Sequence, residues 1–238
     1  MRFDTTSIYK SNDKDNPTGL VVDGTEVIAR REVEAVPGAF QLLNVLSTSE
    51  CQRFIELTES LGYLADAAVS LPRTIRHNDN VTWVADQTTA DILWQRCGNL
   101  MTINLGLFSG KRAVGLNARF RFYRYRHGDY FKPHTDGAWP GSTVVDHELI
   151  TNAYSDRWSQ LSFILFLSND YSGGHTQFYV DKRNSSGPVR SNDNAAVINV
   201  RTLAGAALCF PHGTHRLHCL HSSEAITSGT KYIIRSDV

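Results

Sequence analysis

The chain has 238 residues, 41% of them hydrophobic, and its 24 Lys and Arg residues equal its 24 Asp and Glu residues in number. This length fits one large β-rich domain with a full hydrophobic core. The balanced charge excludes the general basic excess that is typical of nucleic-acid-binding proteins, so we expect no nucleic-acid partner.

The sequence also argues against secretion and membrane insertion. The start of the chain, Met1 to Thr5, is not followed by the roughly 7–15 apolar residues of a secretory signal. The longest strongly apolar run, Leu161–Leu167, is far shorter than the ~20 residues that span a membrane. We therefore expect a soluble, cytoplasmic protein without a membrane partner. Its scattered cysteines should be reduced thiols, mostly in the core, rather than a zinc cluster: Cys51, Cys97, Cys209 and Cys219.

The first part of the chain is expected to be an arm followed by a helix. Residues 1–20 are polar and predict a flexible or loop-like arm ahead of a single domain over residues 21–238. Ser47, with Glu50 three residues later, has the capping-box pattern of a helix start. Gly62 is placed to end that helix. Its apolar face would hold Cys51, Phe54 and Ile55.

A second helix is expected to begin near Thr88 or Thr89. Its buried stripe would consist of Leu93, Cys97, Leu100 and Met101. The two helices would give helical support over residues 45–110, and a β-rich core would follow over residues 115–238.

Strand patterns begin after residue 115. Side chains alternate between the two faces of a strand. In the stretch Asn117–Arg126, one face would therefore hold Arg119, Arg121, Tyr123 and Tyr125, and the other Phe120, Phe122, Arg124 and Arg126. Further strands are expected at Leu161–Leu167, Gln177–Val180, Ala195–Val200, Ala206–Phe210 and Lys231–Ser236. Helices followed by many short strands indicate an α+β, mainly β domain with a sandwich or barrel core.

The segment around His134 carries the first chemical signal. In an extended stretch, His134 and Asp136 are two residues apart and point the same way. One further His would complete a two-His, one-carboxylate face, which leaves positions open for cosubstrate and O₂ in non-haem Fe(II) oxygenases. His-x-Asp is a weak pattern by itself, and an ordinary surface turn is the alternative.

The C-terminal segment carries the second signal. His221 lies ten residues before Lys231, which enters the last predicted strand. The distal carboxylate of a buried 2-oxoglutarate would need a cation, because an unpaired buried charge is costly. Lys231 could be that cation, and Arg235 lies on the same strand face.

Three segments resemble the Fe(II)/2-oxoglutarate-dependent dioxygenase superfamily, and within it the prolyl 4-hydroxylase-like branch. Asn117–Gly137 is similar to that branch's Arg- and Tyr-rich strand that leads into His-x-Asp. Leu161–Phe178 resembles its Gly-Gly-x-Thr turn, and the final 18 residues resemble its distal His followed by Ser-Gly-x-Lys-Tyr.

The resemblance implies a double-stranded β-helix, or jelly roll, with iron at one mouth. It implies that the metal ligands and catalytic residues are His134, Asp136 and His221. For 2-oxoglutarate it implies Lys231 as anchor and Tyr125 as hydroxyl partner, with Tyr123 on the same strand face and Arg235 as the alternative anchor. His218 is the fallback for the distal ligand, and His212 and His215 would be surface residues or pocket lining.

The expected reaction hydroxylates an unactivated carbon of a peptidyl proline or a small amino-acid-like substrate and releases succinate and CO₂. Its cofactors would be Fe(II), 2-oxoglutarate and O₂, with ascorbate as reductant. Trp139–Trp158 and Asp181–Asn194 are candidate lids that would exclude water. Two alternatives remain open: a non-catalytic jelly-roll binding module, and a cupin-like enzyme that uses another divalent metal.

The expected partner is a small-molecule or peptide substrate, and the sequence leaves the oligomeric state open. Arg119, Arg121 and Trp139 are the candidate substrate residues, because the fork of an arginine can bind two oxygens at once. The alternative is that these arginines pair with acidic side chains and brace the barrel.

Overall fold

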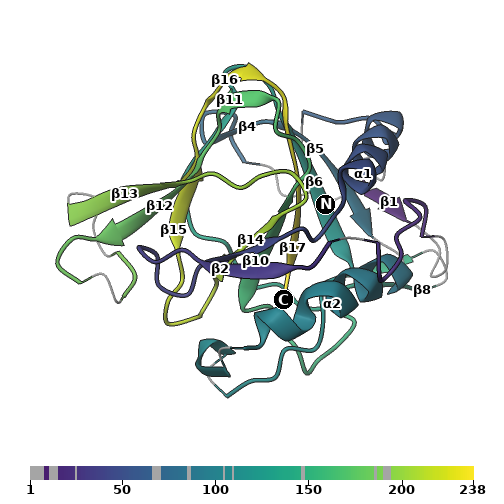
Figure 1. The fold of residues 1–238 in the computed structure, drawn as a ribbon, viewed down its shortest axis with the longest axis horizontal. Coiled ribbons are helices and arrows are strands. Elements are labelled where there is room, and N and C mark those ends of the chain that lie inside the picture. Colours follow the sequence, from purple (N-terminus) through teal and green to yellow (C-terminus); the bar gives the residue numbers. More distant parts are fainter. Residues whose placement is uncertain are drawn as a thin grey trace.

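The structure is a computed structural model that describes residues 8–10, 16–24, 26–65, 71–84, 87–103, 105–108, 110–145, 148–184, 187–189 and 194–238. Two helices lie on the outer side of a large sheet, and a smaller sheet lies on its other side (Figure 1).

The two helices form where the sequence predicts them. Helix α1 (Thr48–Leu61) begins at the capping box of Ser47 and Glu50, in which each side chain bonds the backbone N–H of the other residue. It ends at Gly62, whose positive φ of 87° suits a glycine. Helix α2 (Gln87–Met101) buries the expected stripe except for Leu100, which is partly buried, and the short 3-10 helix η2 (Leu105–Phe108) follows it.

The larger sheet contains eight of the described strands: β1 (Ile8–Lys10), β2 (Ala29–Glu32), β3 (Phe40–Leu43), β5 (Asp79–Val84), β6 (Arg119–Tyr125), β10 (Leu161–Phe166), β14 (Ala207–Pro211) and β17 (Lys231–Asp237). Their order across the sheet is β1-β5-β6-β17-β10-β14-β3-β2. All neighbours pair antiparallel except β1 and β5.

The smaller sheet has the order β13-β12-β15-β7-β4. Its strands are β13 (Ala195–Val200), β12 (Thr176–Asp181), β15 (Leu220–Ser223), β7 (Tyr130–His134) and β4 (Arg76–His77). Two further pairs are β11 (Tyr171–Gly173) with β16 (Ile226–Gly229), and β8 (Thr143–Val145) with β9 (Glu148–Ile150). The predicted α+β, mainly β class with a jelly-roll core is therefore confirmed.

Two apolar clusters hold these layers together. The outer cluster packs α1 and α2 against the outer face of the larger sheet, and it includes Phe120 and Phe122 of β6. The inner cluster fills one part of the space between the sheets, and it includes Phe166, Phe178 and Phe210. Strand β10 is buried on both faces because a layer covers each of them, which explains why all of its residues except Ser162 are apolar. All four cysteines are free and buried, as predicted.

The predicted N-terminal arm contains one element that the sequence did not indicate. Ile8–Lys10 forms β1, which pairs with Thr82–Val84 at the edge of the larger sheet. A sheet edge offers unpaired backbone N–H and C=O groups, and pairing with β1 satisfies part of that edge.

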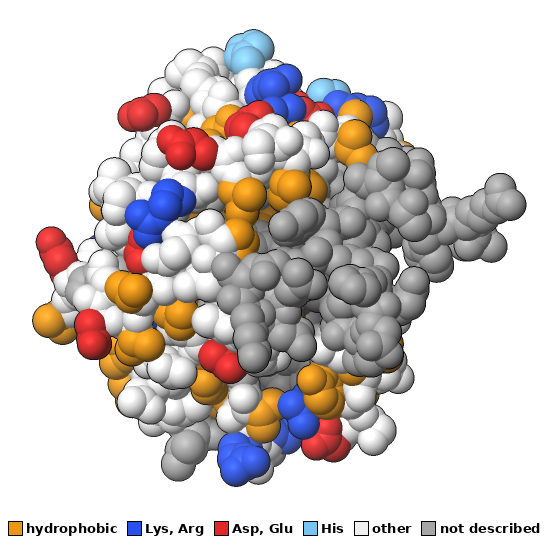
Figure 2. Space-filling model, turned by 90° about the vertical axis from the view of Figure 1, so that its right-hand side faces the viewer, with side chains coloured by type: hydrophobic (Ala, Val, Ile, Leu, Met, Phe, Trp, Pro, Cys, Tyr) orange, Lys and Arg blue, Asp and Glu red, His pale blue; other side chains and the backbone are white. Residues whose placement is uncertain are grey.

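Within the described residues, the structure contains no helix of the length and hydropathy that a bilayer crossing requires. On the face shown in Figure 2, acidic and basic side chains are interspersed among apolar and uncharged ones, in keeping with the balanced charge of the sequence.

A buried ion pair ties the two helices together. Arg96 of α2 lies 2.7 Å from the carboxylate of Glu50 at the start of α1, and the two side chains are 1% and 3% exposed. Arg96 also donates to the carbonyl of Val45. Burial acts to raise the pKa of Glu50, but hydrogen bonds from Arg96 and Ser47 outweigh it and lower that pKa.

We predict that Arg96→Met costs about 3–5 kcal/mol of unfolding free energy, because Glu50 would remain buried without its counter-charge. Urea unfolding at pH 7 measures this loss. The double variant Glu50→Gln/Arg96→Met should lose less than the two single losses together. Because the folded pKa of Glu50 is lowered, the wild-type advantage over the double variant should begin to decrease as the pH falls below about 4.5 and should be lost below the folded pKa. Arg157→Met, which breaks the surface pair with Asp156, is the control and should leave the midpoint unchanged.

Candidate metal centre and its cavity

Two histidines and one aspartate meet at the centre of the smaller sheet. His134 ends β7 and lies directly opposite His221 of β15 in the antiparallel register. Asp136 follows two residues after His134 and remains on the same side. Each residue offers one possible ligand atom, a ring nitrogen or a carboxylate oxygen, and these three atoms lie within 4.8 Å of one another. This is the trio that the sequence analysis selected.

Hydrogen bonds fix which nitrogen of each imidazole faces the centre. His134 Nδ1 lies 2.8 Å from the carbonyl of Lys132, and His221 Nδ1 lies 3.1 Å from the carbonyl of Cys219. An Nδ1 that donates to a carbonyl leaves Nε2 with a free lone pair. Both Nε2 atoms lie 3.7 Å from the carboxylate of Asp136.

The electrostatic state of the trio suits a cation. Burial lowers the pKa of His134 to about 3, and repulsion from His221 adds to this effect. Burial also lowers the pKa of His221. For Asp136, burial acts to raise the pKa, but Arg235 and the two imidazoles outweigh it and hold the pKa below its usual value. At neutral pH the site therefore presents two neutral imidazoles and one carboxylate.

A chain of buried side chains, which sequence reasoning missed, supports Asp136. Ser162 donates to Asp136 Oδ2 at 2.6 Å, and His212 Nδ1 lies 2.9 Å from the Ser162 hydroxyl. The other ring nitrogen of His212 lies 2.8 Å from the hydroxyl of Ser159. The sequence signal for His212 was only its place in a run of histidines, so its position next to β10 could not be inferred.

The donor set fits a divalent metal ion such as Fe(II). Two imidazole nitrogens and one carboxylate on one side of a site leave several coordination positions open for small ligands. The carboxylate is oriented by Ser162 and both imidazoles by backbone carbonyls, as metal ligands in proteins usually are. The trio also faces a cavity rather than packed side chains.

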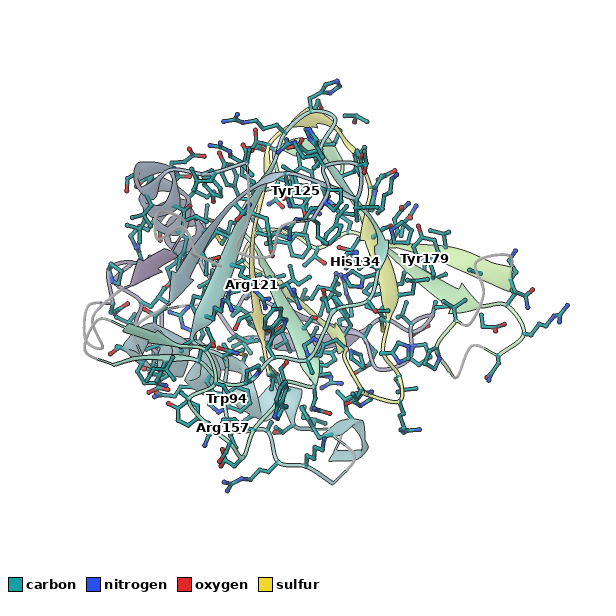
Figure 3. The ribbon with its side chains drawn as sticks, turned by 180° about the vertical axis from the view of Figure 1, so that it is seen from behind. Trp94, Arg121, Tyr125, His134, Arg157 and Tyr179 are labelled. Carbon is teal, nitrogen blue, oxygen red and sulfur yellow. The ribbon has the colours of Figure 1, made fainter. Side chains whose placement is uncertain are left out.

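The cavity has a volume of about 330 Å³ and lies between the two sheets. Figure 3 shows Arg121 and Tyr125 along one side of this region and His134 across from them. The larger sheet contributes Arg119, Arg121, Tyr123, Tyr125, Lys231, Ile233 and Arg235 to its wall. The predicted alternation of β6 is therefore confirmed, since Phe120 and Phe122 instead pack in the outer cluster.

Lys231 lies at one end of the cavity. It is 1% exposed, and its ammonium donates to the carbonyl of Gly174 at 2.7 Å and to the hydroxyl of Ser223 at 3.3 Å. No carboxylate of the described residues lies within ion-pair distance of it. Burial, with a smaller contribution from Arg201, lowers the pKa of Lys231 to about 7. Among the described residues, the lysine thus has no carboxylate close enough for an ion pair, although the more distant Glu224 acts to raise its pKa.

The two tyrosines line the wall beside it. Tyr125 lies opposite Lys231 in the register of β6 and β17, and the Lys231 ammonium is 5.4 Å from the Tyr125 ring centre. Burial raises the pKa of Tyr125 above its usual value, so the phenol is neutral at physiological pH. Tyr123 lies opposite Ile233, one step further along the same face.

Arg235 differs from Lys231 in having its charge compensated. Its guanidinium lies 3.3 Å from Asp136 and 3.2 Å from Asp237. Burial acts to lower the pKa of Arg235, but these two carboxylates outweigh it and raise that pKa. Its contacts therefore favour a role in orienting Asp136.

The three candidate substrate residues come together at the other end of the cavity. The guanidinium carbons of Arg119 and Arg121 lie 5.5 Å and 5.3 Å from the ring centre of Trp139. Arg121 also forms a buried ion pair with Asp237. In this part of the wall, both guanidinium groups thus lie over the ring of Trp139, and Arg121 has an acidic partner.

The two candidate lids are described to different extents. Trp139–Trp158 contains the hairpin β8–β9, and a bridge between Pro140 and Trp158 closes its base. In the loop Asp181–Asn194, residues 185–186 and 190–193 lie outside the described part of the chain. Both lid assignments stay predictions.

The remaining histidines lie away from the trio. The ring of His218 contacts the backbone carbonyl of His215. The ring of His215 in turn contacts the backbone carbonyl of Leu107 in η2. His175 pairs with Glu224, and His77 pairs with Asp129. Within the described residues, the trio is the only group of three His, Cys, Asp or Glu side chains that lie close enough together to hold a metal ion.

Comparison with known proteins agrees with this geometry. The sequence profile of the 2OG-Fe(II) oxygenase superfamily matches residues 120–236, which hold the trio and Lys231. A search of curated protein sequences gives no match.

Solved structures share the fold at low sequence identity. A viral collagen prolyl hydroxylase from Paramecium bursaria Chlorella virus-1 has a TM-score of 0.55 and 14% identity, with 87% of this chain and 98% of that chain covered. A prolyl-4-hydroxylase from Pseudomonas putida has a TM-score of 0.53 and 16% identity, with 85% of this chain and 92% of that chain covered. A prolyl hydroxylase from Trichoplax adhaerens has a TM-score of 0.55 and 14% identity, with 94% of this chain and 89% of that chain covered. The profile match assigns residues 120–236 to the 2OG-Fe(II) oxygenase superfamily. The structural likeness shows that the chain has a prolyl hydroxylase-like fold.

Proposed function

We propose that this protein is a 2-oxoglutarate-dependent hydroxylase that holds Fe(II) with His134, Asp136 and His221. One observation carries the proposal. The trio faces a cavity whose end holds Lys231, a buried side chain without a carboxylate partner in the described part of the protein. A metal alone would not require such a lysine, whereas a dicarboxylate between metal and lysine would.

The proposed reaction converts R–H, O₂ and 2-oxoglutarate into R–OH, succinate and CO₂. Fe(II), when bound, supplies the site at which O₂ is reduced as 2-oxoglutarate loses CO₂. The residues of the chain prepare this chemistry. The imidazoles offer Nε2 lone pairs because their Nδ1 atoms bond backbone carbonyls, and Arg235 and Ser162 keep Asp136 ionised and oriented.

In this proposal Lys231 anchors the distal carboxylate of 2-oxoglutarate. A buried ammonium is strongly disfavoured unless an anion accompanies it. Lys231 lies beside Tyr125, Phe166 and Tyr171, whose rings exclude water from the ammonium. Arg235 is the weaker candidate for this anchor because Asp136 and Asp237 already compensate its charge.

The substrate is proposed more broadly, as a peptidyl proline or a small amino-acid-like molecule that is hydroxylated at an unactivated carbon. The prolyl hydroxylase-like fold supports the first, and the small cavity supports the second. Ascorbate as reductant is an expectation from the family. Neither alternative function explains the buried lysine, since a binding module without metal needs no trio and an enzyme with metal alone needs no Lys231.

The direct test is to incubate Fe(II)-loaded protein with 2-oxoglutarate and pools of candidate substrates. We expect O₂ uptake, succinate formation and a product that is about 16 mass units heavier, the mass of one oxygen atom. Protein that binds neither Fe(II) nor 2-oxoglutarate would refute the proposal.

The metal assignment predicts that His221→Ala abolishes turnover and weakens Mn(II) binding, measured anaerobically by electron paramagnetic resonance. The loss should exceed the roughly 10- to 100-fold that removing a hydrogen-bond partner of a metal ligand typically costs. His218→Ala is the matched control, since it removes a neighbouring histidine that lies outside the trio. Equal Mn(II) affinity in wild type and His221→Ala would show that the distal ligand lies elsewhere.

The anchor assignment predicts opposite effects of Lys231→Met on binding and stability. The 2-oxoglutarate affinity of Mn(II)-loaded protein should fall roughly 10- to 150-fold, because a charge-assisted contact is lost. Without 2-oxoglutarate, thermal unfolding at pH 6 should occur at a higher temperature than in wild type, since the buried charge is removed. A destabilised variant with unchanged 2-oxoglutarate affinity would assign Lys231 a structural role.

The lowered pKa of Lys231 predicts a pH dependence of 2-oxoglutarate binding. Above pH 7 the protonated fraction of Lys231 falls, so the Kd of Mn(II)-loaded protein should rise by up to about tenfold per pH unit between pH 7 and 9. Lys231→Arg should flatten this profile, because a guanidinium stays charged. Titration calorimetry measures both profiles, and identical slopes in the two proteins would contradict the prediction.

A further inference from the structure

The cavity has two cationic ends on the same pair of strands. Along the register of β6 and β17, Tyr125 faces Lys231, Tyr123 faces Ile233, and Arg121 faces Arg235. Lys231 and Arg235 are four residues apart, or about 13 Å along an extended strand. We call the end that holds Arg119, Arg121 and Arg235 the arginine end. The trio adjoins it, since Asp136 contacts Arg235.

The charges at the arginine end are only partly compensated. Asp237 pairs with both Arg121 and Arg235, and Asp136 pairs with Arg235. When Asp136 serves a metal ion, one carboxylate remains for three guanidinium groups. Two of these three positive charges then lack a counter-charge among the described residues, and Arg119 is the guanidinium with no carboxylate of the described residues within ion-pair distance.

Arg119 also lacks hydrogen-bond acceptors in the described part of the protein. Its guanidinium makes no hydrogen bond there, and its buried Nε has no partner. The buried indole N–H of neighbouring Trp139 has none either. Burial, followed by repulsion from Arg121, lowers the pKa of Arg119. Donors held together in this way without an acceptor are costly to the free protein.

We propose that Arg119, with Arg121 behind it and Trp139 beneath it, binds the carboxylate of a small substrate. The substrate would then be a free acid, such as an amino acid, rather than an interior residue of a peptide. This inference rests on the proposed function, because it takes the Lys231 end as the place of 2-oxoglutarate.

Size and charge both favour a small carboxylate. The cavity of about 330 Å³ must hold 2-oxoglutarate as well, whereas small-molecule pockets commonly measure ≈ 300–1,000 Å³ for one ligand. A planar guanidinium matches the two oxygens of a carboxylate. A peptide bond is neutral and would leave Arg119 without a counter-charge.

The first test locates the anion site without knowledge of the substrate. Crystals of protein loaded with Mn(II) and 2-oxoglutarate are soaked in sodium bromide, and anomalous diffraction locates the bromide. We expect bromide in contact with the Arg119 guanidinium and no bromide there in Arg119→Gln. The absence of bromide from this position in wild type, or its persistence in the variant, would overturn the proposal.

The second test identifies the chemical class. Titration calorimetry under anaerobic conditions measures binding of L-proline and L-leucine, each against its amide, to protein loaded with Mn(II) and 2-oxoglutarate. Inorganic phosphate and an end-blocked tripeptide with a central proline are further arms. We expect at least one acid to bind ten-fold or more tightly than its amide, and tighter than phosphate or the tripeptide.

Variants then assign the preference to Arg119. Arg119→Gln should weaken binding of the preferred acid roughly 10- to 100-fold and remove its advantage over the amide. Arg119→Lys should retain part of it, because the charge remains. Arg126→Gln removes an exposed arginine just beyond β6 and is the control for both affinity and folding.

The outcomes separate this inference from the proposed function. If 2-oxoglutarate does not bind the Mn(II)-loaded wild type, the proposed function fails. If it binds but no acid is preferred over its amide, or the preference survives in Arg119→Gln, the inference fails and the proposed function stands. Tighter binding of phosphate or of the blocked tripeptide would likewise overturn the assignment of a small carboxylate.

Discussion

The antiparallel register of β7 and β15, in which His134 lies opposite His221, is the constraint on which the site depends. A shift of one residue would turn one imidazole to the other face of the sheet. Phe178 is the partner of His221 on the opposite side of β15, and its ring packs against Phe210 in the inner cluster. The apolar packing that stabilises the smaller sheet therefore also fixes the positions of the atoms that we propose as metal ligands.

Because side chains alternate along its strands, the larger sheet packs apolar residues against the helices on one face and presents the cavity residues on the other. On β6, Phe120 and Phe122 pack outward beneath the helices, while Arg121, Tyr123 and Tyr125 face the cavity. The outer cluster supplies apolar burial on the face that the helices cover, whereas the cavity face of the same sheet also carries buried charged side chains such as Lys231 and Arg121. The helices thus do not form the site. They cover the outer face of the larger sheet, and this packing stabilises a sheet whose inner face carries charged side chains.

Charge inside the cavity is arranged in two ways. Around Asp136 it is compensated, with Arg235 and Ser162 as direct partners and His212 behind them. At Lys231 and Arg119, within the described residues, it is not compensated. A protein that keeps buried cations without counter-charges loses stability, and bound anions can restore it. The cavity between the two cations, with the trio in its wall, is suited to hold two anionic molecules.

Local patterns in the sequence predicted much of this protein. The capping box of α1, the stripe of α2 and the alternation of β6 could be recognised because each depends on residues close in the chain. The set of His134, Asp136, His221 and Lys231 was implied by the resemblance to the dioxygenase superfamily, whose motifs keep a fixed local spacing. Strands such as β2, β4 and β5 could not be recognised, because their pairing depends on partners far away in the sequence. Only the tertiary structure showed that Arg235 has carboxylate partners, whereas Lys231 and Arg119 have none within ion-pair distance in the part of the chain that the structure describes. The charge state of a buried side chain depends on which distant residues surround it, and the sequence does not list those neighbours.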